Sequence, residues 1–137
     1  HDKPIGRVAV ISPWNFPLAI PAGMLCGAYI TGNKVILKPA EQTTLIALIL
    51  VEAFYQAGAK KEDILFAPGK GEVIGQHLVL SEDIDMDVFT GSRAVGEWIY
   101  KTKLLQSGDK RVVAEMGGKN AMIISANAEL DEATSGI

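Results

Sequence analysis

Two polar side chains follow apolar, strand-like runs and could take part in catalysis. Asn15 lies between two prolines in residues 12–17, a context that can hold a side-chain amide rigidly as a hydrogen-bond donor. Glu115 ends a second such run and precedes two glycines, where a carboxylate could act as a general base. Taken alone, Asn15 could instead cap the following helix, and Glu115 could pair with Lys119 or Arg111.

A second group of residues could hold a ligand that carries hydroxyl and phosphate groups. Lys38 and Glu41 offer an ammonium donor and a carboxylate acceptor that suit a diol, although both could be solvated charges at a helix start. Gly91 and Ser92 combine room for a phosphate with a hydroxyl and the beginning of a helix. The glycines within residues 69–75 lack the spacing of a dinucleotide fingerprint, and either glycine cluster could be a simple turn.

Strand-like and helix-like segments alternate along the chain and must position these residues. This alternation predicts an α/β fold, a doubly wound parallel sheet of Rossmann type. Ligands of such sheets bind outside the carboxyl ends of the strands, which is where the polar motifs fall. The predicted strands are residues 7–12, 35–37, 64–66, 87–89 and 111–115, with 121–124 as a further candidate; the predicted helices are 18–30, 43–57, 72–80, 93–102 and a last one opening at Glu129.

The apolar pattern also predicts which side chains are buried. Cys26 lies in an apolar helical segment, so we expect a packed and inert thiol. Glu115 is expected to end a buried strand, which would raise its pKa toward that of a general base. Residues 106–110 are expected to form an ordinary surface loop. The helix predicted at residues 43–57 is expected to pack through Leu45, Ile46, Ile49, Leu50, Ala53 and Phe54.

Length and composition narrow the class of protein. The chain has 137 residues, of which 48% are hydrophobic, enough for one compact domain with a core. Its net charge of −3 comes without a Lys/Arg cluster, which argues against nucleic acid or an anionic membrane as partner and favours a small molecule. No apolar run approaches the roughly 20 residues of a membrane-spanning helix. We therefore expect a soluble protein of the cytoplasm or the mitochondrial matrix.

Cysteine and histidine contents exclude two further kinds of site. The single cysteine, Cys26, cannot form an internal disulfide and is compatible with a reducing compartment. His1 and His77 are too isolated to form a catalytic triad or a metal site. We expect no bound metal.

Four motifs, in this order, resemble the aldehyde dehydrogenase superfamily. They are SPWNFP at residues 12–17, KPAEQT at 38–43, FTGS at 89–92 and EMGGK at 115–119. The resemblance runs from about Gly6 to the last residue. It implies that residues 1–137 are the Rossmann-like, NAD-binding segment of a longer protein, a homo-oligomer whose catalytic and oligomerisation domains lie outside this chain.

The resemblance also implies a reaction and two catalytic roles. In the family a cysteine thiolate attacks an aldehyde, and the resulting thioester is hydrolysed to a carboxylic acid. Asn15 would donate a hydrogen bond to the oxyanion, and Glu115 would deprotonate the hydrolytic water. The family's nucleophile lies beyond the counterpart of Ile137, so the isolated chain is expected to be inactive.

For the cofactor, the resemblance implies NAD, with NADP less favoured because of the carboxylate of Glu41. Lys38 and Glu41 would contact the ribose hydroxyls, Ser92 the pyrophosphate and Val95 the adenine. The residues assigned to cofactor binding are Ile11, Ser12, Pro13, Trp14, Lys38, Ala40, Glu41, Gly69, Gly71, Gly91, Ser92, Val95, Met116 and Gly117.

The wording of residues 11–20, 89–93 and 114–121 is similar to that of 1-pyrroline-5-carboxylate dehydrogenases, including the dehydrogenase module of bifunctional proline utilization proteins. Those enzymes oxidise glutamate semialdehyde to glutamate in proline breakdown. Another semialdehyde dehydrogenase, such as one for succinate semialdehyde, stays open. So does a non-catalytic nucleotide-binding module, although such a module needs neither Asn15 nor Glu115.

Overall fold

Strands and helices alternate along the chain, as the sequence predicts. The computed structural model describes residues 3–106 and 108–135, and its elements are numbered in chain order. The strands are β1 (Arg7–Ile11), β2 (Lys34–Lys38), β3 (Ile64–Phe66), β4 (Met86–Thr90) and β5 (Arg111–Glu115). The helices are α1 (Ala19–Ile30), α2 (Thr44–Gln56), α3 (Gln76–Leu80), α4 (Arg93–Leu104) and α5 (Leu130–Ser135), with short turns η1 (Glu41–Thr43) and η2 (Gly71–Gly75) before α2 and α3.

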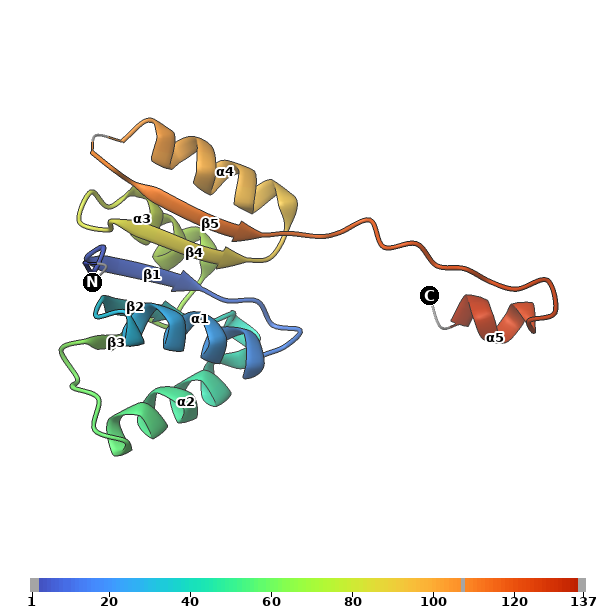
Figure 1. The fold of residues 1–137 in the computed structure, drawn as a ribbon, viewed down its shortest axis with the longest axis horizontal. Coiled ribbons are helices and arrows are strands. Elements are labelled where there is room, and N and C mark those ends of the chain that lie inside the picture. The colour runs from blue at the N-terminus through green and yellow to red at the C-terminus, as the bar shows by residue number, and fades with distance from the viewer. Residues whose placement is uncertain (1–2, 107, 136–137) are drawn as a thin grey trace.

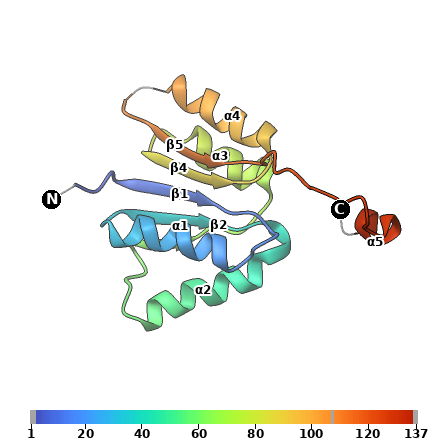
Figure 2. The same cartoon turned by 45° about the vertical axis from the view of Figure 1, so that its right-hand side comes forward.

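The five strands form one parallel sheet in the order β3-β2-β1-β4-β5. Helices α1 and α2 lie on one face of the sheet, and α3 and α4 lie on the other (Figures 1 and 2). The chain thus winds outward from β1 in both directions, which confirms the predicted doubly wound α/β fold. The predictions for His1 and for the end of the last helix fall outside the described residues.

The core has two sides because the central strands are buried on both faces. Val8 and Val10 of β1 point toward α1 and α2, whereas Ala9 points toward α3. Alternate side chains of one strand therefore serve two different layers, as expected of a parallel sheet with helices on both faces. The first layer contains Val8, Val10, Leu25, Val35, Leu37, Ala47, Val51 and Ile64.

The buried face of α2 differs from the predicted one. Ala47 and Val51 are the fully buried residues of this helix, whereas Leu45 and Ile49 are exposed. Leu50 and Phe54 pack against the core as predicted, but the prediction was wrong for Leu45 and Ile49, because α2 is apolar almost all the way round and its periodicity does not single out one face. Cys26 was also wrongly predicted: it lies on the exposed side of α1, which is a helix as expected.

The candidate strand at residues 121–124 does not form. Residues 116–129 leave the sheet as an extended arm that ends in α5, apart from the body of the fold (Figure 1). Ile123 is 93% exposed there. An isolated β-prone segment has no neighbouring strand to satisfy its backbone hydrogen bonds, so local sequence alone does not make it a strand.

The segment that leads into α3 contains an unusual helical turn. The predicted helix at residues 72–80 consists of a π-helical turn, η2, followed by the short α-helix α3. Single π turns are rare and frequently occur at functional sites. Gly69 enters this turn with φ of +148°, and a Cβ there would lie 2.6 Å from Cγ1 of Ile74.

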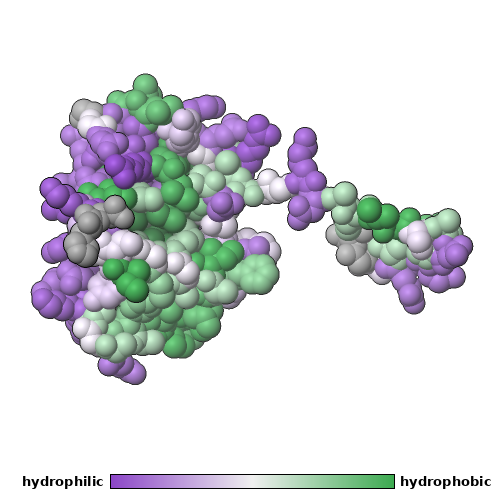
Figure 3. All heavy atoms as spheres, in the orientation of Figure 1, coloured by the Kyte–Doolittle hydropathy of each residue, from purple (hydrophilic) through white to green (hydrophobic). Residues whose placement is uncertain are grey.

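The helices cover the two faces unequally. Between α1 and the strands β4 and β5 lies an apolar cavity of about 280 Å³, bordered by Met24, Val88 and Val113 among others. Val113 is 45% exposed, and apolar residues gather over α1, α2 and the adjacent sheet in Figure 3. Over β5, only the α4 side of the sheet is covered. The longest described helix, α2, has 13 residues, which is too few to span a membrane.

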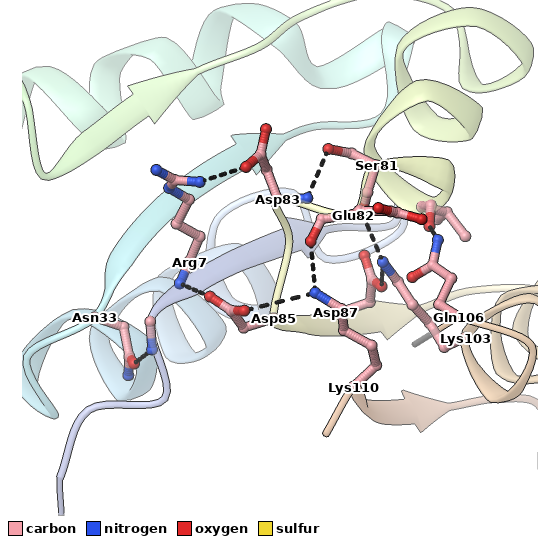
Figure 4. A network of polar contacts seen from close by, with 12 residues as sticks. Arg7, Asn33, Ser81, Glu82, Asp83, Asp85, Asp87, Lys103, Gln106 and Lys110 are labelled. Atoms are coloured by element: carbon pink, nitrogen blue, oxygen red, sulfur yellow. Dashed lines mark hydrogen bonds and ion pairs between the residues drawn. The ribbon is translucent and has the colours of Figure 1, made fainter. Parts of the chain in front are cut away.

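A buried ion pair links β4 to α4 near the amino ends of the strands (Figure 4). Nζ of Lys103 lies 3.1 Å from Oδ2 of Asp87, and the two residues are 3% and 0% exposed. Neither oxygen of Asp87 has an aligned hydrogen-bond donor. Burial raises the pKa of Asp87 to about 6, and the charges of Lys103 and Lys110 oppose this shift.

This pair predicts a pH dependence of stability. Because the pKa of Asp87 is raised from 3.8 to about 6, the folded protein keeps a proton that the unfolded chain has lost between these pH values. The contribution of Asp87 to stability should therefore decrease as the pH rises from 4 to 6, by about 3 kcal/mol. The apolar double variant D87L/K103M lacks this group.

Urea unfolding of both proteins across pH 4 to 8 measures the effect. The stability of the wild type relative to D87L/K103M should fall through the window and level off above it. A difference that does not change with pH would contradict the prediction.

Candidate functional site

All five strands end at the same edge of the sheet, and the polar motifs follow them there. Asn15 follows β1, Lys38 ends β2, Gly91 follows β4 and Glu115 ends β5. This edge is where doubly wound proteins bind their ligands. The motifs form two neighbouring cavities.

The strand-end cavity has a volume of about 380 Å³ and contains both predicted catalytic residues. Asn15 reaches it from the loop after β1, and Glu115 reaches it from β5. The ends of β4 and β5 are joined there by a hydrogen bond of 3.1 Å from the Gly91 N–H to the carbonyl oxygen of Glu115. The lining residues are Pro13, Trp14, Asn15, Thr90, Gly91, Ser92, Glu115, Met116 and Gly117.

The surroundings of Asn15 and Glu115 bear on their alternative roles. Asn15 does not cap α1, whose N-cap position is Leu18. Arg111 pairs with Asp109 at 2.8 Å rather than with Glu115. The expected burial of Glu115 was wrong, because β5 is an edge strand with one face uncovered and Glu115 is exposed. Both side chains are thus accessible to a molecule in the cavity.

The inter-helix cavity has a volume of about 450 Å³ and lies between the segment η2–α3 and helix α4. Among the predicted cofactor-binding residues, Ile11, Glu41, Gly71 and Val95 line it. Its volume is within the range of small-molecule sites, and most of its side chains are apolar, as suits a flat ring system. The remaining lining residues are Glu72, Gly75, Gln76, Val79, Ala94, Trp98 and Ile99.

Helix α4 begins where the two cavities meet. Oγ of Ser92 accepts a hydrogen bond from the Val95 N–H at 3.4 Å and so caps this helix. At Gly91 a Cβ would lie 2.6 Å from Cζ of Phe89, so a larger residue there would meet the buried ring of Phe89. The exposed backbone donors at such a helix start favour an anion.

Lys38 and Glu41 lie in different surroundings. Lys38 is only 5% exposed, and its Nζ donates to the carbonyl oxygen of Pro39 at 2.9 Å, so it is not a solvated loop charge. Burial lowers the pKa of Lys38, and the carboxylate of Glu41 opposes this shift. Oε1 of Glu41 accepts from the Gly71 N–H at 3.0 Å, which ties the loop after β2 to η2.

Four predicted cofactor-binding residues line neither cavity. Lys38 lies beneath Gly75, where an added Cβ would be 3.9 Å from its Cδ and Cε. Ser12 is buried with a hydroxyl that has no hydrogen-bond partner, and Ala40 accepts from the Thr43 backbone at 3.1 Å. Gly69 serves the entry into η2 described above. These four residues therefore do not line the cavities but lie next to residues that do.

Three residues that line the inter-helix cavity, Trp98 and Ile99 of α4 and Val79 of α3, were not predicted from the sequence. Helical spacing could have found the first two, because they lie three and four residues after Val95. Val79 carried no such signal, since its position depends on the π turn that precedes α3. Among residues 3–106 and 108–135 there is no cluster of three or more metal-binding side chains.

Comparison with known proteins gives one family for the whole chain. The model of the family described as "Aldehyde dehydrogenase family" matches residues 1–137. The 1-pyrroline-5-carboxylate dehydrogenase of Staphylococcus epidermidis (strain ATCC 12228 / FDA PCI 1200) is 45% identical over 139 residues, which cover 98% of this chain. The chain spans only 27% of the length of that relative.

Solved structures agree with this family. Proline utilization A (PutA) from Bdellovibrio bacteriovorus, inactivated by N-propargylglycine, is 47% identical with a TM-score of 0.83, over 96% of this chain and 14% of its own. The 1-pyrroline-5-carboxylate dehydrogenase from Thermus with bound NAD is 42% identical (TM-score 0.80; 85% and 23% covered). The NADP-dependent glyceraldehyde-3-phosphate dehydrogenase from Bacillus halodurans C-125, complexed with NADP, is 40% identical (TM-score 0.81; 97% and 27% covered).

The close approach at Gly91 leads to a prediction about stability. In Gly91→Ala the new methyl group would displace the ring of Phe89 from the core, so we expect a loss of about 1 to 3 kcal/mol. The matched control is Gly27→Ala in the exposed side of α1, where nothing lies within 4 Å and a gain of about 0.5 to 1 kcal/mol is expected. Thermal unfolding measures both, and equal shifts would show that Phe89 yields freely.

Proposed function

The chain belongs to the aldehyde dehydrogenase family, and on that premise we propose that it is the nucleotide-binding part of an enzyme that oxidises an aldehyde to a carboxylic acid with NAD. The observation that supports this most is the strand-end cavity, which is lined both by Asn15 from the loop after β1 and by Glu115 from the end of β5. A module that only bound nucleotide would need neither group.

In the proposed reaction Asn15 is the oxyanion donor. When a thiolate adds to an aldehyde, the carbonyl oxygen becomes negative and needs a donor already in place. Asn15 can supply this donor because its side chain lies on a short loop between two prolines and is not engaged in capping α1. A donor of this kind is worth about 3 to 4 kcal/mol in comparable sites.

Glu115 is the proposed general base. After oxidation the acyl group is held as a thioester, and an attacking water must lose a proton to be reactive. Glu115 lies at the end of β5 beside Met116 and Gly117, all in the strand-end cavity, and its exposure gives water access. The two glycines that follow let its backbone move relative to the rigid strand.

The nucleophile must come from elsewhere in the whole protein. Cys26 is exposed on α1 and lines neither cavity of the site. We therefore propose that the catalytic thiol lies in the part of the protein that this chain does not include, and that the chain alone is inactive. Assembly as a homo-oligomer stays a prediction from the family, and a place in the cytoplasm stays a prediction from the composition and the single cysteine.

NAD fits the residues present. The inter-helix cavity offers apolar walls for adenine, with Val95 and Trp98 on one side, and Glu41 stands where it can accept hydrogen bonds from ribose hydroxyls. The capped start of α4 at Ser92 suits the pyrophosphate. NAD, when bound, accepts the hydride that leaves the substrate. We favour NAD over NADP because a 2′-phosphate would meet the carboxylate of Glu41.

Glutamate semialdehyde is the proposed substrate, because two relatives named 1-pyrroline-5-carboxylate dehydrogenase cover 98% and 85% of the chain at 45% and 42% identity. Succinate semialdehyde is the second candidate, since it also carries a carboxylate and an aldehyde, although it is one carbon shorter and lacks the amino group. Initial rates of NADH formation by the full-length protein distinguish them. Glutamate semialdehyde should be the better substrate by kcat/KM, and equal values would reject this assignment.

Replacement of Asn15 tests the oxyanion role. In the full-length protein, Asn15→Ala should lower kcat by about 100- to 1000-fold and leave nucleotide binding unchanged, because the donor acts on the reacting oxygen. Asn127→Ala, in an exposed turn of the arm, is the control and should be neutral. A kcat within threefold of the wild type would remove Asn15 from the mechanism.

Glu41 should govern the choice of nucleotide. Without its charge, Glu41→Gln should raise the ratio of kcat/KM for NADP to that for NAD by about tenfold, since repulsion of the 2′-phosphate is lost. Glu62→Gln, an exposed carboxylate before β3, serves as control. An unchanged ratio would mean that another group selects the nucleotide.

A further inference from the structure

The inter-helix cavity has walls that are not continuous in the chain. One wall is η2 and α3, with Gly75, Gln76 and Val79, and the other is α4, with Val95 and Trp98 among its residues. The width of the cavity therefore depends on the spacing between α3 and α4. This spacing must be fixed by contacts outside the cavity itself.

Such contacts lie at the end of the two helices remote from the strand-end cavity (Figure 4). Nε2 of Gln106 donates to the carbonyl oxygens of Val79 and Leu80, each at 3.0 Å. These carbonyls end α3, where backbone acceptors have no partner within the helix. Gln106 lies two residues after α4, so its amide ties the end of one helix to the end of the other.

Lys103 makes the second tie. It extends from α4 to Asp87 of β4 at 3.1 Å and to the carbonyl oxygen of Ser81, just after α3, at 3.4 Å. Together with Gly96 and Ile99 it forms the buried side of α4. One ammonium group thus contacts the sheet and α3 while belonging to α4.

The contacts of Lys103 and Gln106 lie next to the inter-helix cavity. Ile99 lines the cavity one helical turn before Lys103, and the side chain of Val79 lines it while the carbonyl of the same residue is held by Gln106. A shift of α3 or α4 at the tied end would therefore move cavity walls. When one of these contacts is removed, α3 or α4 is expected to shift as a unit, because close-packed interiors transmit strain.

We propose that Lys103 and Gln106 are positioning residues that set the separation of α3 and α4 and thereby the fit of the inter-helix cavity to the adenosine part of the nucleotide. This role rests on the proposed function, since it concerns the same cavity. Neither residue lines the cavity, so neither touches the nucleotide.

The test uses two variants of the full-length protein and one control. Gln106→Ala removes the amide and leaves the ion pair intact. D87L/K103M removes both buried charges at similar volume, a change that is often neutral or stabilising because no unpaired charge remains. The control Lys101→Met removes an exposed ammonium of α4 that pairs with Glu97 at 3.7 Å.

Calorimetric titration with NAD, steady-state kinetics and thermal unfolding give the readouts. Both test variants should raise Kd and KM for NAD at least fivefold, with KM for the aldehyde and kcat within twofold of the wild type. Lys101→Met should change none of these. For D87L/K103M the thermal midpoint should stay at or above that of the wild type, so that weaker NAD binding is separated from loss of stability.

Unchanged Kd for NAD in both folded variants would overturn the inference and leave the proposed function standing. A wild-type protein that binds neither NAD nor NADP would overturn the proposed function, and the inference with it. Should D87L/K103M fail to fold, Gln106→Ala decides alone. Hydrogen exchange of the backbone amides of residues 76–80, measured without nucleotide, gives an independent readout. These amides should exchange faster in Gln106→Ala than in the wild type, and an unchanged rate would show that Gln106 does not hold α3 in place.

Discussion

The parallel direction of every strand is the constraint on which the rest of the structure depends. Each strand must be followed by a return path over a face of the sheet, so all loops that follow strands collect at one edge. Residues far apart in the chain, such as Asn15 and Glu115, come to line the same cavity for this reason. Backbone topology therefore determines which residues meet at that edge, and the local motifs then determine their chemistry.

The same constraint gives the two ends of the sheet different tasks. At the carboxyl ends, short loops and glycines such as Gly71 and Gly91 line the two cavities. At the amino ends, Asp85 accepts from the Arg7 N–H at 2.8 Å, and Lys110 and Lys103 reach carboxylates of the β4 region (Figure 4). Ionic and amide contacts at this edge hold the layers together, which leaves the opposite edge free to bind a ligand.

The sequence predicted the fold and the strand-end cavity well because both follow from signals that are local. Apolar β-branched runs and helix starts depend on a few neighbouring residues, and topology then determines which loops meet. Burial was harder to predict. The faces of α2 and β5 depend on which layers are present to cover them, and an almost wholly apolar helix or an edge strand carries no mark of that in its own residues.

The predicted loop at residues 106–110 lies between α4 and β5 as expected, but two of its side chains make contacts that its sequence does not indicate. The stretch is polar and short, which is typical of a surface loop, yet Gln106 and Lys110 both donate to backbone carbonyls of the α3–β4 region. A single side chain that satisfies a helix end far away in the sequence leaves no periodic pattern. Such contacts are found only once the chain has been placed in space.

The π turn of η2 has a consequence for how this protein can vary. A π turn accommodates one residue more than an α turn, which rotates everything after it by about 100° around the helix axis. With that rotation, Leu78 and Val79 face the sheet and are buried. The loss of one codon between Gly71 and Gly75 would move each following residue one position back, so that Leu78 would take the exposed position that His77 now holds. Most surface turns tolerate insertions and deletions. In this turn the number of residues determines which side chains of α3 are buried.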